Sequence, residues 1–277
     1  MVLDLDAELA RFRAAYQPQC ATFAGVTWRY IVGGHGPTTL LLLPGAPGIA
    51  EMAFPYLAAF AQHQRVIAPS YPAEIGSLED LLAGLTALLA AETTGPIQLI
   101  GASYSGIVAQ YFLHRHPERI ASLLIGDTGV PRRARARALQ LALAVIVRLP
   151  RLGLHATLAV VLAYVLAGGT PAHHFWQRYF KGVVALLTVP EFANRVRVML
   201  DMDRQGHELH QVSPWHGPTL LMETADDPLF SAVERAALRL RFPHAEVHTF
   251  YTQGHITALT RAPEYIAVMQ AFLARHC

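Results

Sequence analysis

Short apolar runs alternate with longer segments of helical periodicity along most of this chain. Five of the runs have the length and composition of buried strands: 27–32, 38–43, 65–69, 96–101 and 120–125. Apolar residues recur at helical spacing between and before them, which predicts helices at 4–16, 51–62 and 78–91 and a further one that Pro117 ends. This alternation is typical of a mostly parallel sheet with helices on both faces, so the sequence predicts an α/β fold.

The alternation stops after residue 130. From 131 to 215 the apolar pattern is helical, and no segment has clear strand character. Strand character returns at 219–222 and 246–251, followed by helices that run to Arg241 and from Pro263 to about residue 274. We therefore expect one α/β core in two parts, residues 1–130 and 216–277, separated by an all-helical cap at 131–215.

Composition narrows the classes of function. The chain has 277 residues, of which 53% are hydrophobic and 15% charged, and its formal net charge is +2. Such a balance is unlike that of a nucleic-acid-binding protein, so we expect no nucleic-acid partner. The longest apolar tract, 139–165, is interrupted by Arg148, Pro150, Arg151 and His155, and no piece of it reaches the roughly 18 apolar residues of a membrane-spanning helix. The sequence thus predicts a soluble protein without a membrane span.

Cysteine and histidine usage points to a cytoplasmic protein without a metal. Cys20 and Cys277 lie near opposite ends and do not form the pattern of a disulfide framework, and residues 1–13 contain no apolar core of a signal peptide. Among 14 histidines none belongs to a metal-binding H-E-x-x-H motif, and the adjacent His173 and His174 would point apart. We expect neither a metal nor another cofactor, and the oligomeric state stays open.

Ser103 lies at the turn between the strand 96–101 and the helix that follows it. Gly101 precedes it by two positions, where a nucleophile elbow needs a small residue so that strand and helix can approach closely. The matching position after it holds Ser105 rather than glycine, with Gly106 one residue later. The pattern predicts that Ser103 is a nucleophile; the alternative is a small-residue turn in which Ser103 only caps the helix.

A base and an acid follow in the order that such a nucleophile requires. A serine hydroxyl becomes nucleophilic when a base takes its proton and a third group holds the base. Asp226 and Asp227 come just after the strand 219–222, and His255 comes just after the strand 246–251. Because the carboxyl ends of parallel strands meet at one edge of the sheet, we expect Ser103, one of the two aspartates and His255 to converge there.

Two backbone N–H groups are candidates for an oxyanion hole. One belongs to Tyr104, directly after the nucleophile, and the other to Ala46, in the segment Pro44-Gly45-Ala46 that follows the strand 38–43. The alternative for this segment is a simple glycine–proline turn.

Over nearly its whole length the chain resembles α/β-hydrolase-fold serine hydrolases with a helical cap. The resemblance rests on Leu41-Leu42-Leu43-Pro44-Gly45, Gly101-Ala102-Ser103-Tyr104-Ser105-Gly106, Asp226-Asp227-Pro228 and Gly254-His255. The segment 65–72, Gly101-Ala102-Ser103 and Ala109-Gln110 are also similar to maspardin-like proteins.

This resemblance implies which aspartate is the catalytic acid. In the family the acid usually comes three residues after a glycine that ends the strand. Thr224 holds that place here, so the resemblance implies that Asp227 is the acid, with Asp226 as the other candidate. The absence of the glycine is a departure from the family's pattern.

The insertion bears on the substrate. Residues 138–147 and 158–166 are apolar nearly all round, so we expect them to be covered on several sides, either by other helices or by an apolar cavity above Ser103. An apolar roof predicts medium-chain or aromatic ester substrates. The arginines from Arg132 to Arg137 are either a solvated face, which their spacing favours, or a grip for an anionic group or a membrane surface. Aromatic residues at 173–180 either line a pocket or pack within the cap.

Three kinds of function remain open at this point. The first is hydrolysis of an ester or related acyl bond through an acyl-enzyme on Ser103. A C–C hydrolase, a lactonase or a thioesterase would use the same three residues. A non-catalytic binding protein that keeps the fold is the alternative from a different class.

Overall fold

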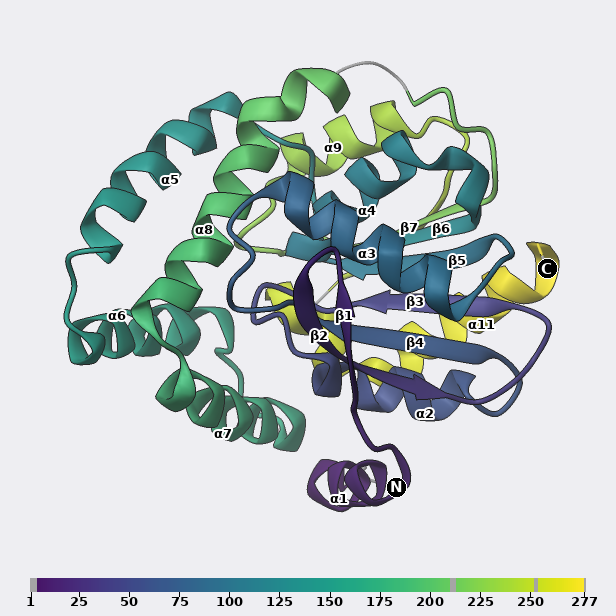
Figure 1. Ribbon diagram of the computed structural model, residues 1–277, viewed down its shortest axis with the longest axis horizontal. Helices are drawn as coiled ribbons and strands as arrows, with labels where there is room; N and C mark the ends of the chain where they lie inside the picture. Colours follow the sequence, from purple (N-terminus) through teal and green to yellow (C-terminus); the bar gives the residue numbers. More distant parts are fainter. Residues whose placement is uncertain (1–3, 210–212, 252–253, 277) are drawn as a thin grey trace.

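An eight-stranded sheet forms the centre of the computed structural model, which describes residues 4–209, 213–251 and 254–276 (Figure 1). The strand order is β1-β2-β4-β3-β5-β6-β7-β8. Strand β2 runs antiparallel to both of its neighbours, and all other neighbours are parallel. The strands are β1 (Gln19–Phe23), β2 (Val26–Gly33), β3 (Thr39–Leu43), β4 (Arg65–Ser70), β5 (Ile97–Ala102), β6 (Ile120–Gly126), β7 (Thr219–Thr224) and β8 (Glu246–Phe250).

Helices cover both faces of the sheet, as the alternating sequence pattern predicts. One face carries α3 (Leu78–Glu92), α4 (Tyr104–Arg115) and α9 (Ala232–Arg241), and the other carries α1 (Leu5–Ala15), α2 (Phe54–Phe60) and α11 (Ala262–His276). Along β3, Leu41 and Leu43 belong to the first core and Leu40 and Leu42 to the second, because side chains alternate along a strand. Short helical turns complete the core: η1 (Ala50–Ala53), η2 (Pro117–Arg119), η4 (Gly254–Ile256) and α10 (Thr257–Thr260).

Two elements of the core differ from the sequence-based expectation. The sequence pattern does not predict strand β1, because Gln19–Phe23 lies at the sheet edge with mostly exposed side chains and shows no apolar alternation. The single helix expected at 51–62 is instead η1 followed by α2. Pro55 stands in the first turn of α2, where a missing N–H is tolerated, so the helix starts afresh there.

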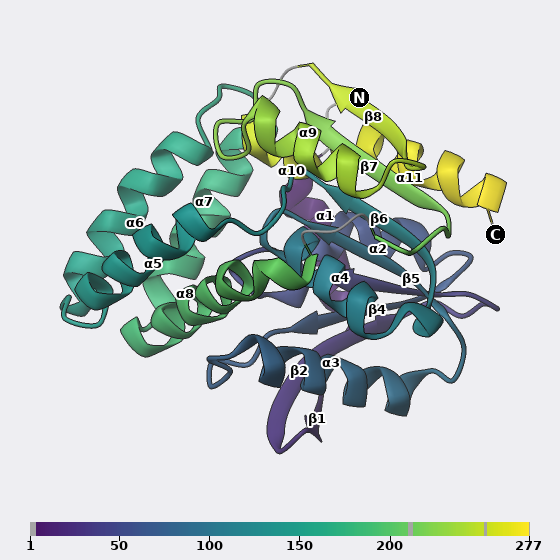
Figure 2. The same ribbon diagram turned by 90° about the horizontal axis from the view of Figure 1, so that it is seen from above.

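Between β6 and β7 the described residues form helices joined by loops, and no strand. The helices are α5 (Arg133–Ile146), α6 (Arg151–Val165), α7 (Pro171–Leu186), α8 (Val189–Arg204) and η3 (Gln205–Leu209). Figures 1 and 2 show α5 to α8 gathered at one end of the sheet, opposite the C-terminus. The aromatic residues expected at 173–180 attach this insertion to the core: the ring centroids of Phe175 and Trp176 lie 5.9 and 5.8 Å from that of Phe54 on α2.

The expectation that the two apolar segments of the insertion are covered on several sides is wrong. Against the described part of the chain, α5 buries only Ala136 and α6 buries only Leu154. The reason is that α5 packs on α8 and α6 packs mainly on α7, so each helix has its principal contact on one side. Large apolar side chains such as Leu141 and Val160, each 72% exposed, are left at the surface.

Candidate active site

Ser103 occupies a strained turn between β5 and α4. Its backbone has φ 56° and ψ −122°, a left-handed conformation that is uncommon for a residue with a side chain. The turn is tight, because a Cβ placed on Gly101 would lie only 2.5 Å from the backbone oxygen of Ser105. The Ser103 N–H donates to the carbonyl of Gly126 at the end of β6 over 2.9 Å. The strand–turn–helix expected from the sequence is therefore present, with Ser103 at its apex.

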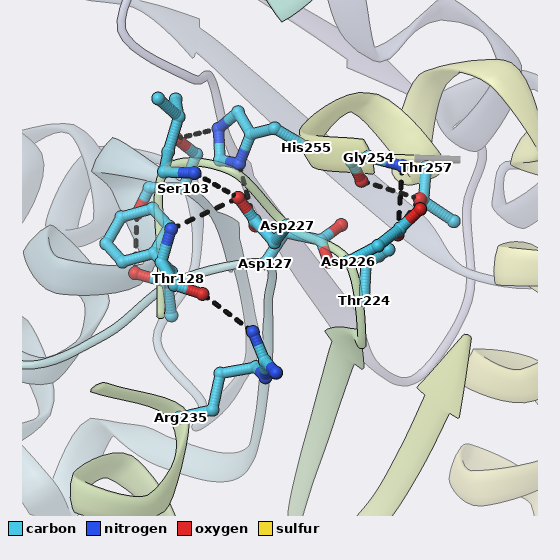
Figure 3. A network of polar contacts seen from close by, with 12 residues as sticks. Ser103, Asp127, Thr128, Thr224, Asp226, Asp227, Arg235, Gly254, His255 and Thr257 are labelled. Atoms are coloured by element: carbon cyan, nitrogen blue, oxygen red, sulfur yellow. Dashed lines mark hydrogen bonds and ion pairs between the residues drawn. The ribbon is translucent and has the colours of Figure 1, made fainter. Parts of the chain in front are cut away.

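The structure brings Ser103, His255 and Asp227 together at the carboxyl ends of the strands (Figure 3). The Ser103 Oγ atom lies 2.8 Å from His255 Nε2, and His255 Nδ1 lies 2.9 Å from Asp227 Oδ2. The side chains of His255 and Asp227 are 8% and 1% exposed. With Nδ1–H donated to the carboxylate, His255 Nε2 carries a lone pair toward the serine hydroxyl, which is the arrangement that proton removal needs.

The two candidate aspartates have different positions. Asp227 is buried, and its second oxygen, Oδ1, accepts hydrogen bonds from the N–H groups of Leu229 at 2.7 Å and Phe230 at 3.1 Å. Asp226 is exposed and accepts from the Gly254 N–H at 3.2 Å, next to the histidine. The geometry therefore gives Asp227 the contact with the imidazole and gives Asp226 a role in holding the loop. Thr252 and Gln253, which precede Gly254, lie outside the described residues.

A further carboxyl group, which the sequence analysis did not single out, lies beside this site. Asp127 follows β6 with φ 42° and is 3% exposed. Its Oδ1 lies 2.7 Å from Thr224 Oγ1, and its Oδ2 accepts from the Tyr265 hydroxyl at 3.1 Å. Thr224 Oγ1 also lies 2.9 Å from Thr257 Oγ1, which reaches the Gly254 carbonyl at 3.0 Å. Thr224, which stands in the place of the family's glycine, thus links Asp127 to the segment that carries His255.

Counting protons along this network shows which form of Asp127 completes it. Each hydroxyl has one proton to donate. If Asp127 is ionised, Thr224 donates its proton to Asp127. The single hydroxyl proton of Thr257 can then go either to Thr224 or to the Gly254 carbonyl, and the other contact is not a hydrogen bond. If Asp127 is protonated, it donates to Thr224, Thr224 donates to Thr257, and Thr257 donates to Gly254, so every contact is a hydrogen bond.

Burial acts in the same direction as the proton count. Desolvation raises the pKa of Asp127 from 3.8 to about 7, against the lowering effects of the Thr224 hydrogen bond and of His255. The negative charge of Asp227 raises it further, and the Tyr265 hydrogen bond lowers it. Over the acidic range the folded protein therefore holds a neutral carboxyl group beneath its histidine.

Ser105, the residue that departs from the elbow pattern, connects the turn at Ser103 to the 44–48 loop by a hydrogen bond. The Ser105 side chain is fully buried, and its hydroxyl donates a hydrogen bond to the carbonyl of Pro44. The loop itself closes through the Gly48 N–H, which donates to the Gly45 carbonyl at 2.8 Å. Ala46 is exposed within this loop, and Tyr104 opens α4, so its N–H is among those that have no acceptor within a helix. Glycine at 105 could not make the contact with Pro44.

Arg195 of α8 anchors the insertion to the same loop. It is 6% exposed, and its guanidinium donates to the carbonyls of Tyr71 and, at 3.3 Å, Pro72. A Cβ on Gly48, which has φ 70°, would lie 2.7 Å from Arg195 Nη2, so glycine is required for this close approach. Desolvation lowers the pKa of Arg195.

A small apolar cavity adjoins the elbow and the 44–48 loop. It has a volume of about 100 Å³ and is bounded by Gly45, Ala102, Met222, Ala258 and Met269 among others. Ala102, which bounds the cavity, immediately precedes Ser103 in the chain.

The described residues offer no group of three or more His, Cys, Asp or Glu side chains that could hold a metal ion. Within the same residues, no helix is long and apolar enough to cross a membrane. Cys20 is exposed on β1 as a free thiol, and Cys277 lies outside the described residues.

A family model of the alpha/beta hydrolase family matches residues 40–268, which include the elbow and both loops that carry Asp227 and His255. The chain belongs to the alpha/beta hydrolase family. It is 26% identical over 261 residues to a poly(3-hydroxyalkanoate) depolymerase from Ectopseudomonas oleovorans, covering 85% of this chain and 84% of that protein. It is 28% identical over 300 residues to the dihydrolipoyllysine-residue acetyltransferase component of an acetoin cleaving system from Pseudomonas putida, covering 99% and 77%.

Solved structures confirm the fold. A hydrolase from Pseudomonas aeruginosa PA01 superimposes with a TM-score of 0.77 at 19% sequence identity, covering 94% of this chain and 98% of that one. The expected α/β-hydrolase fold, with a mostly parallel sheet and helices on both faces, is therefore confirmed.

Proposed function

We propose that this protein is a serine hydrolase that cleaves an ester or a related acyl bond of an apolar small molecule. The observation that carries the proposal is the 2.8 Å contact between Ser103 Oγ and His255 Nε2, with Asp227 2.9 Å from the other ring nitrogen. A nucleophile, a base and a buried group that orients the base together make acyl transfer possible. The relative named as a poly(3-hydroxyalkanoate) depolymerase also favours an ester, because polymerised hydroxy acids are joined by ester bonds.

In the proposed reaction His255 Nε2 takes the hydroxyl proton of Ser103 as Oγ attacks the acyl carbon. The negative oxygen of the tetrahedral intermediate accepts hydrogen bonds from the N–H groups of Tyr104 and Ala46. His255 then gives the proton to the leaving alcohol, and the acyl group stays on Ser103. Water attacks this ester as His255 removes one of its protons, the acid leaves, and the proton returns to Ser103.

The cavity beside Ala102 supports an apolar acyl group. Its volume of about 100 Å³ is bounded largely by apolar side chains from β3, β5, η1, α10 and α11. Burying a methylene group contributes about 0.8 kcal/mol, so even a short alkyl chain would gain affinity there.

Labelling with a fluorophosphonate probe tests the proposal, because such probes react with an activated serine. We expect the wild type to be labelled and Ser103→Ala to lose both labelling and turnover, the latter by roughly 10³-fold or more, without a fall in melting temperature. Ser122→Ala is the control, since Ser122 is equally a serine but lies buried in β6. A folded wild type that reacts with no probe would overturn the proposal and favour a binding protein with this fold.

A further inference from the structure

The helical insertion has a charge unlike the rest of the chain. Between Asp127 and Glu191 the sequence contains no aspartate or glutamate, although the whole chain has 20 of them. The same stretch holds eight of the chain's 22 lysines and arginines. A molecule that is nearly neutral overall therefore carries a strongly positive segment.

Most of these basic side chains are not neutralised within the described residues. Arg132 pairs with Glu234 at 2.8 Å, Arg135 with Asp203 at 2.7 Å and Arg178 with Asp6 at 2.6 Å. The other five are exposed and have no ion pair with any residue that the structure describes: Arg133, Arg137, Arg148, Arg151 and Lys181. The unpaired positive charge thus lies on α5, in the turn after it, at the start of α6 and on α7.

Apolar side chains are exposed on the same helices. Among the described residues, eight of the thirteen exposed large apolar side chains lie between 141 and 186. Leu141 and Val145 on α5 are 72% and 60% exposed. Along α6, Leu152, Val160 and Tyr164 are 82%, 72% and 64% exposed. Monomeric soluble proteins seldom leave many large apolar side chains exposed close together, so their accumulation on α5 and α6 indicates a binding surface.

Spacing places the two kinds of side chain together. On α5, Arg137, Leu141 and Val145 follow one another at intervals of four residues, which puts them on one helical face, and Arg148 lies in the turn just after the helix. On α6, Val160 and Tyr164 are four residues apart and share a face, and Leu152 is exposed near the start of the same helix. We call these exposed basic and apolar side chains of α5, α6 and the turn between them the basic–apolar surface.

We propose that the basic–apolar surface binds the surface of a lipid bilayer that carries net negative charge. Helices with apolar side chains and arginines on an exposed face lie in the interface, where the apolar groups enter the acyl boundary and the arginines meet anionic headgroups. Helix α6 has 15 residues, so at about 1.5 Å per residue it is too short to cross a hydrocarbon core of roughly 30 Å. The surface therefore rests on the bilayer and does not span it.

The charge of the surface argues against the other occupants. In a symmetric dimer built on this face, the unpaired arginines of one copy would meet those of the other and repel them. A nucleic acid would match the arginines, but its phosphate backbone offers nothing to cover Leu141, Val145 and Leu152. An anionic bilayer satisfies both parts of the surface.

The position of the surface relates it to the site of Ser103. Figure 2 shows α5 and α6 at the end of the molecule farthest from the C-terminus. Helix α6 contacts η4, the short turn that contains His255. A protein bound through α5 and α6 would therefore hold its candidate active site next to the lipid surface.

Sedimentation with lipid vesicles tests the proposal without relying on catalysis. Wild type and Ser103→Ala are mixed with vesicles of phosphatidylcholine alone or with about one-third phosphatidylglycerol. We expect both proteins to sediment with the anionic vesicles, less so at high salt, and neither to sediment with phosphatidylcholine alone. Equal behaviour of the two proteins separates this proposal from the proposed hydrolase function.

Two surface variants and a control locate the contact. The charge variant, Arg137→Gln, Arg148→Gln and Arg151→Gln, should weaken partitioning roughly 100-fold, since each basic side chain near an anionic surface contributes about 1 kcal/mol. The apolar variant, Leu152→Ser, Val160→Ser and Tyr164→Ser, should weaken it as well. Both should keep the wild-type melting temperature and its activity on a soluble ester. The control, Val233→Ser with Leu240→Ser, removes two equally exposed apolar side chains from α9 and should bind like the wild type.

Three results would overturn the proposal. The first is a wild type that sediments equally with both kinds of vesicle, and the second is an α9 control that binds as weakly as the α6 variant. A wild type that is dimeric in solution and becomes monomeric in the α6 variant would assign the surface to a second copy of this chain.

Discussion

Thr224 Oγ1 lies 2.7 Å from the Oδ1 atom of Asp127, and both side chains are buried where β6 and β7 end beside the candidate active site. The contact explains why the strand that precedes Asp227 ends in threonine instead of the family's glycine. Thr224 continues the network through Thr257 to the carbonyl of Gly254, the residue before His255. The network is complete when Asp127 is a neutral carboxylic acid, and this has consequences that can be measured.

The stability of the wild type should fall relative to that of Asp127→Asn as the pH rises from 4 to 7. The pKa of Asp127 is raised to about 7 in the folded protein, so the folded state keeps a proton that the unfolded chain has released over this range. Because only the folded state binds this proton between the two pKa values, the free energy of unfolding falls by up to about 1.4 kcal/mol for each pH unit of increase. Asparagine has no such titration, and its amide can donate to Thr224 while its oxygen accepts from Tyr265.

Denaturant unfolding of both proteins at pH 5 and pH 8 measures this difference. Ionisable groups that do not interact with Asp127 are common to the two proteins and cancel in the comparison. We expect Asp127→Asn to gain roughly 2–3 kcal/mol on the wild type between the two pH values. Asp127→Ala is the control, because it removes the partner of the Tyr265 hydroxyl and one of the two partners of Thr224, so it should be less stable at both pH values. Parallel stability curves for the wild type and the asparagine variant would show that Asp127 does not titrate as proposed.

Asp227→Asn should lower kcat far more than either Asp226→Asn or Asp127→Asn. Only the Asp227 carboxylate contacts His255 Nδ1, and an amide there would favour the wrong tautomer of the imidazole, an effect on the order of 10⁴-fold in a serine protease. Asp226 contacts the Gly254 N–H from an exposed position, so its loss should lower kcat by no more than about tenfold. Steady-state kinetics on one ester compares the three variants. If Asp127→Asn lost the most kcat of the three, the catalytic acid would be Asp127, at the end of β6, and not Asp227.

Ser105→Ala should lower kcat roughly tenfold with little change in KM. The Ser105 hydroxyl holds the carbonyl of Pro44, and the 44–48 loop contains Ala46, the proposed second donor to the oxyanion. A loosened donor weakens the transition state more than substrate binding, and removal of a whole donor is worth about 10²–10³ in kcat. Ser122→Ala is a matched control, since Ser122 is also fully buried and its hydroxyl has no hydrogen-bond partner among the described residues. Equal kinetics for the two variants would show that the contact with Pro44 does not support catalysis.

The sequence predicts most of the core because the central strands, β3 to β7, are almost continuously buried. Strand β3, for example, is five residues of continuous burial, and its carboxyl end leads directly into the 44–48 loop. Strand β1 escapes prediction because pairing with β2 at the sheet edge, and not burial, forms it. Chain order and strand ends alone predict that Ser103, His255 and one of two aspartates converge, and only the family resemblance favours Asp227 over Asp226.

Other parts of the site depend on contacts between distant residues. Ser105 is an irregularity in the motif until its partner Pro44 is known, 61 residues away. Nothing in the sequence distinguishes Asp127 from other aspartates, because its contact with Thr224, 97 residues later, is visible only in the fold. The apolar pattern of α5 and α6 indicates that they need a cover, but a pattern cannot say whether that cover is protein. The described chain leaves most of both helices exposed.

The length of the acyl chain should affect turnover up to a limit set by the cavity beside Ala102. A volume of about 100 Å³ corresponds to roughly three water-sized groups, since a water molecule occupies about 30 Å³ of liquid. Each methylene that enters should raise kcat/KM close to fourfold, at about 0.8 kcal/mol. Across p-nitrophenyl esters we therefore expect a rise from acetate to about butyrate and a slower change beyond it.

Enlarging the cavity should move this limit to longer chains. Met269 bounds the cavity from α11 and is fully buried, so Met269→Ala makes room for further methylenes and should shift the most favoured ester by one or two carbons. Met202→Ala is the matched control, because Met202 is equally buried but belongs to the core on the other side of the sheet. Both variants should lose about 2–5 kcal/mol of stability, so the kinetics are measured well below their melting temperatures. A profile that falls from acetate onward, or one that Met202→Ala shifts as much as Met269→Ala, would show that the acyl chain binds elsewhere.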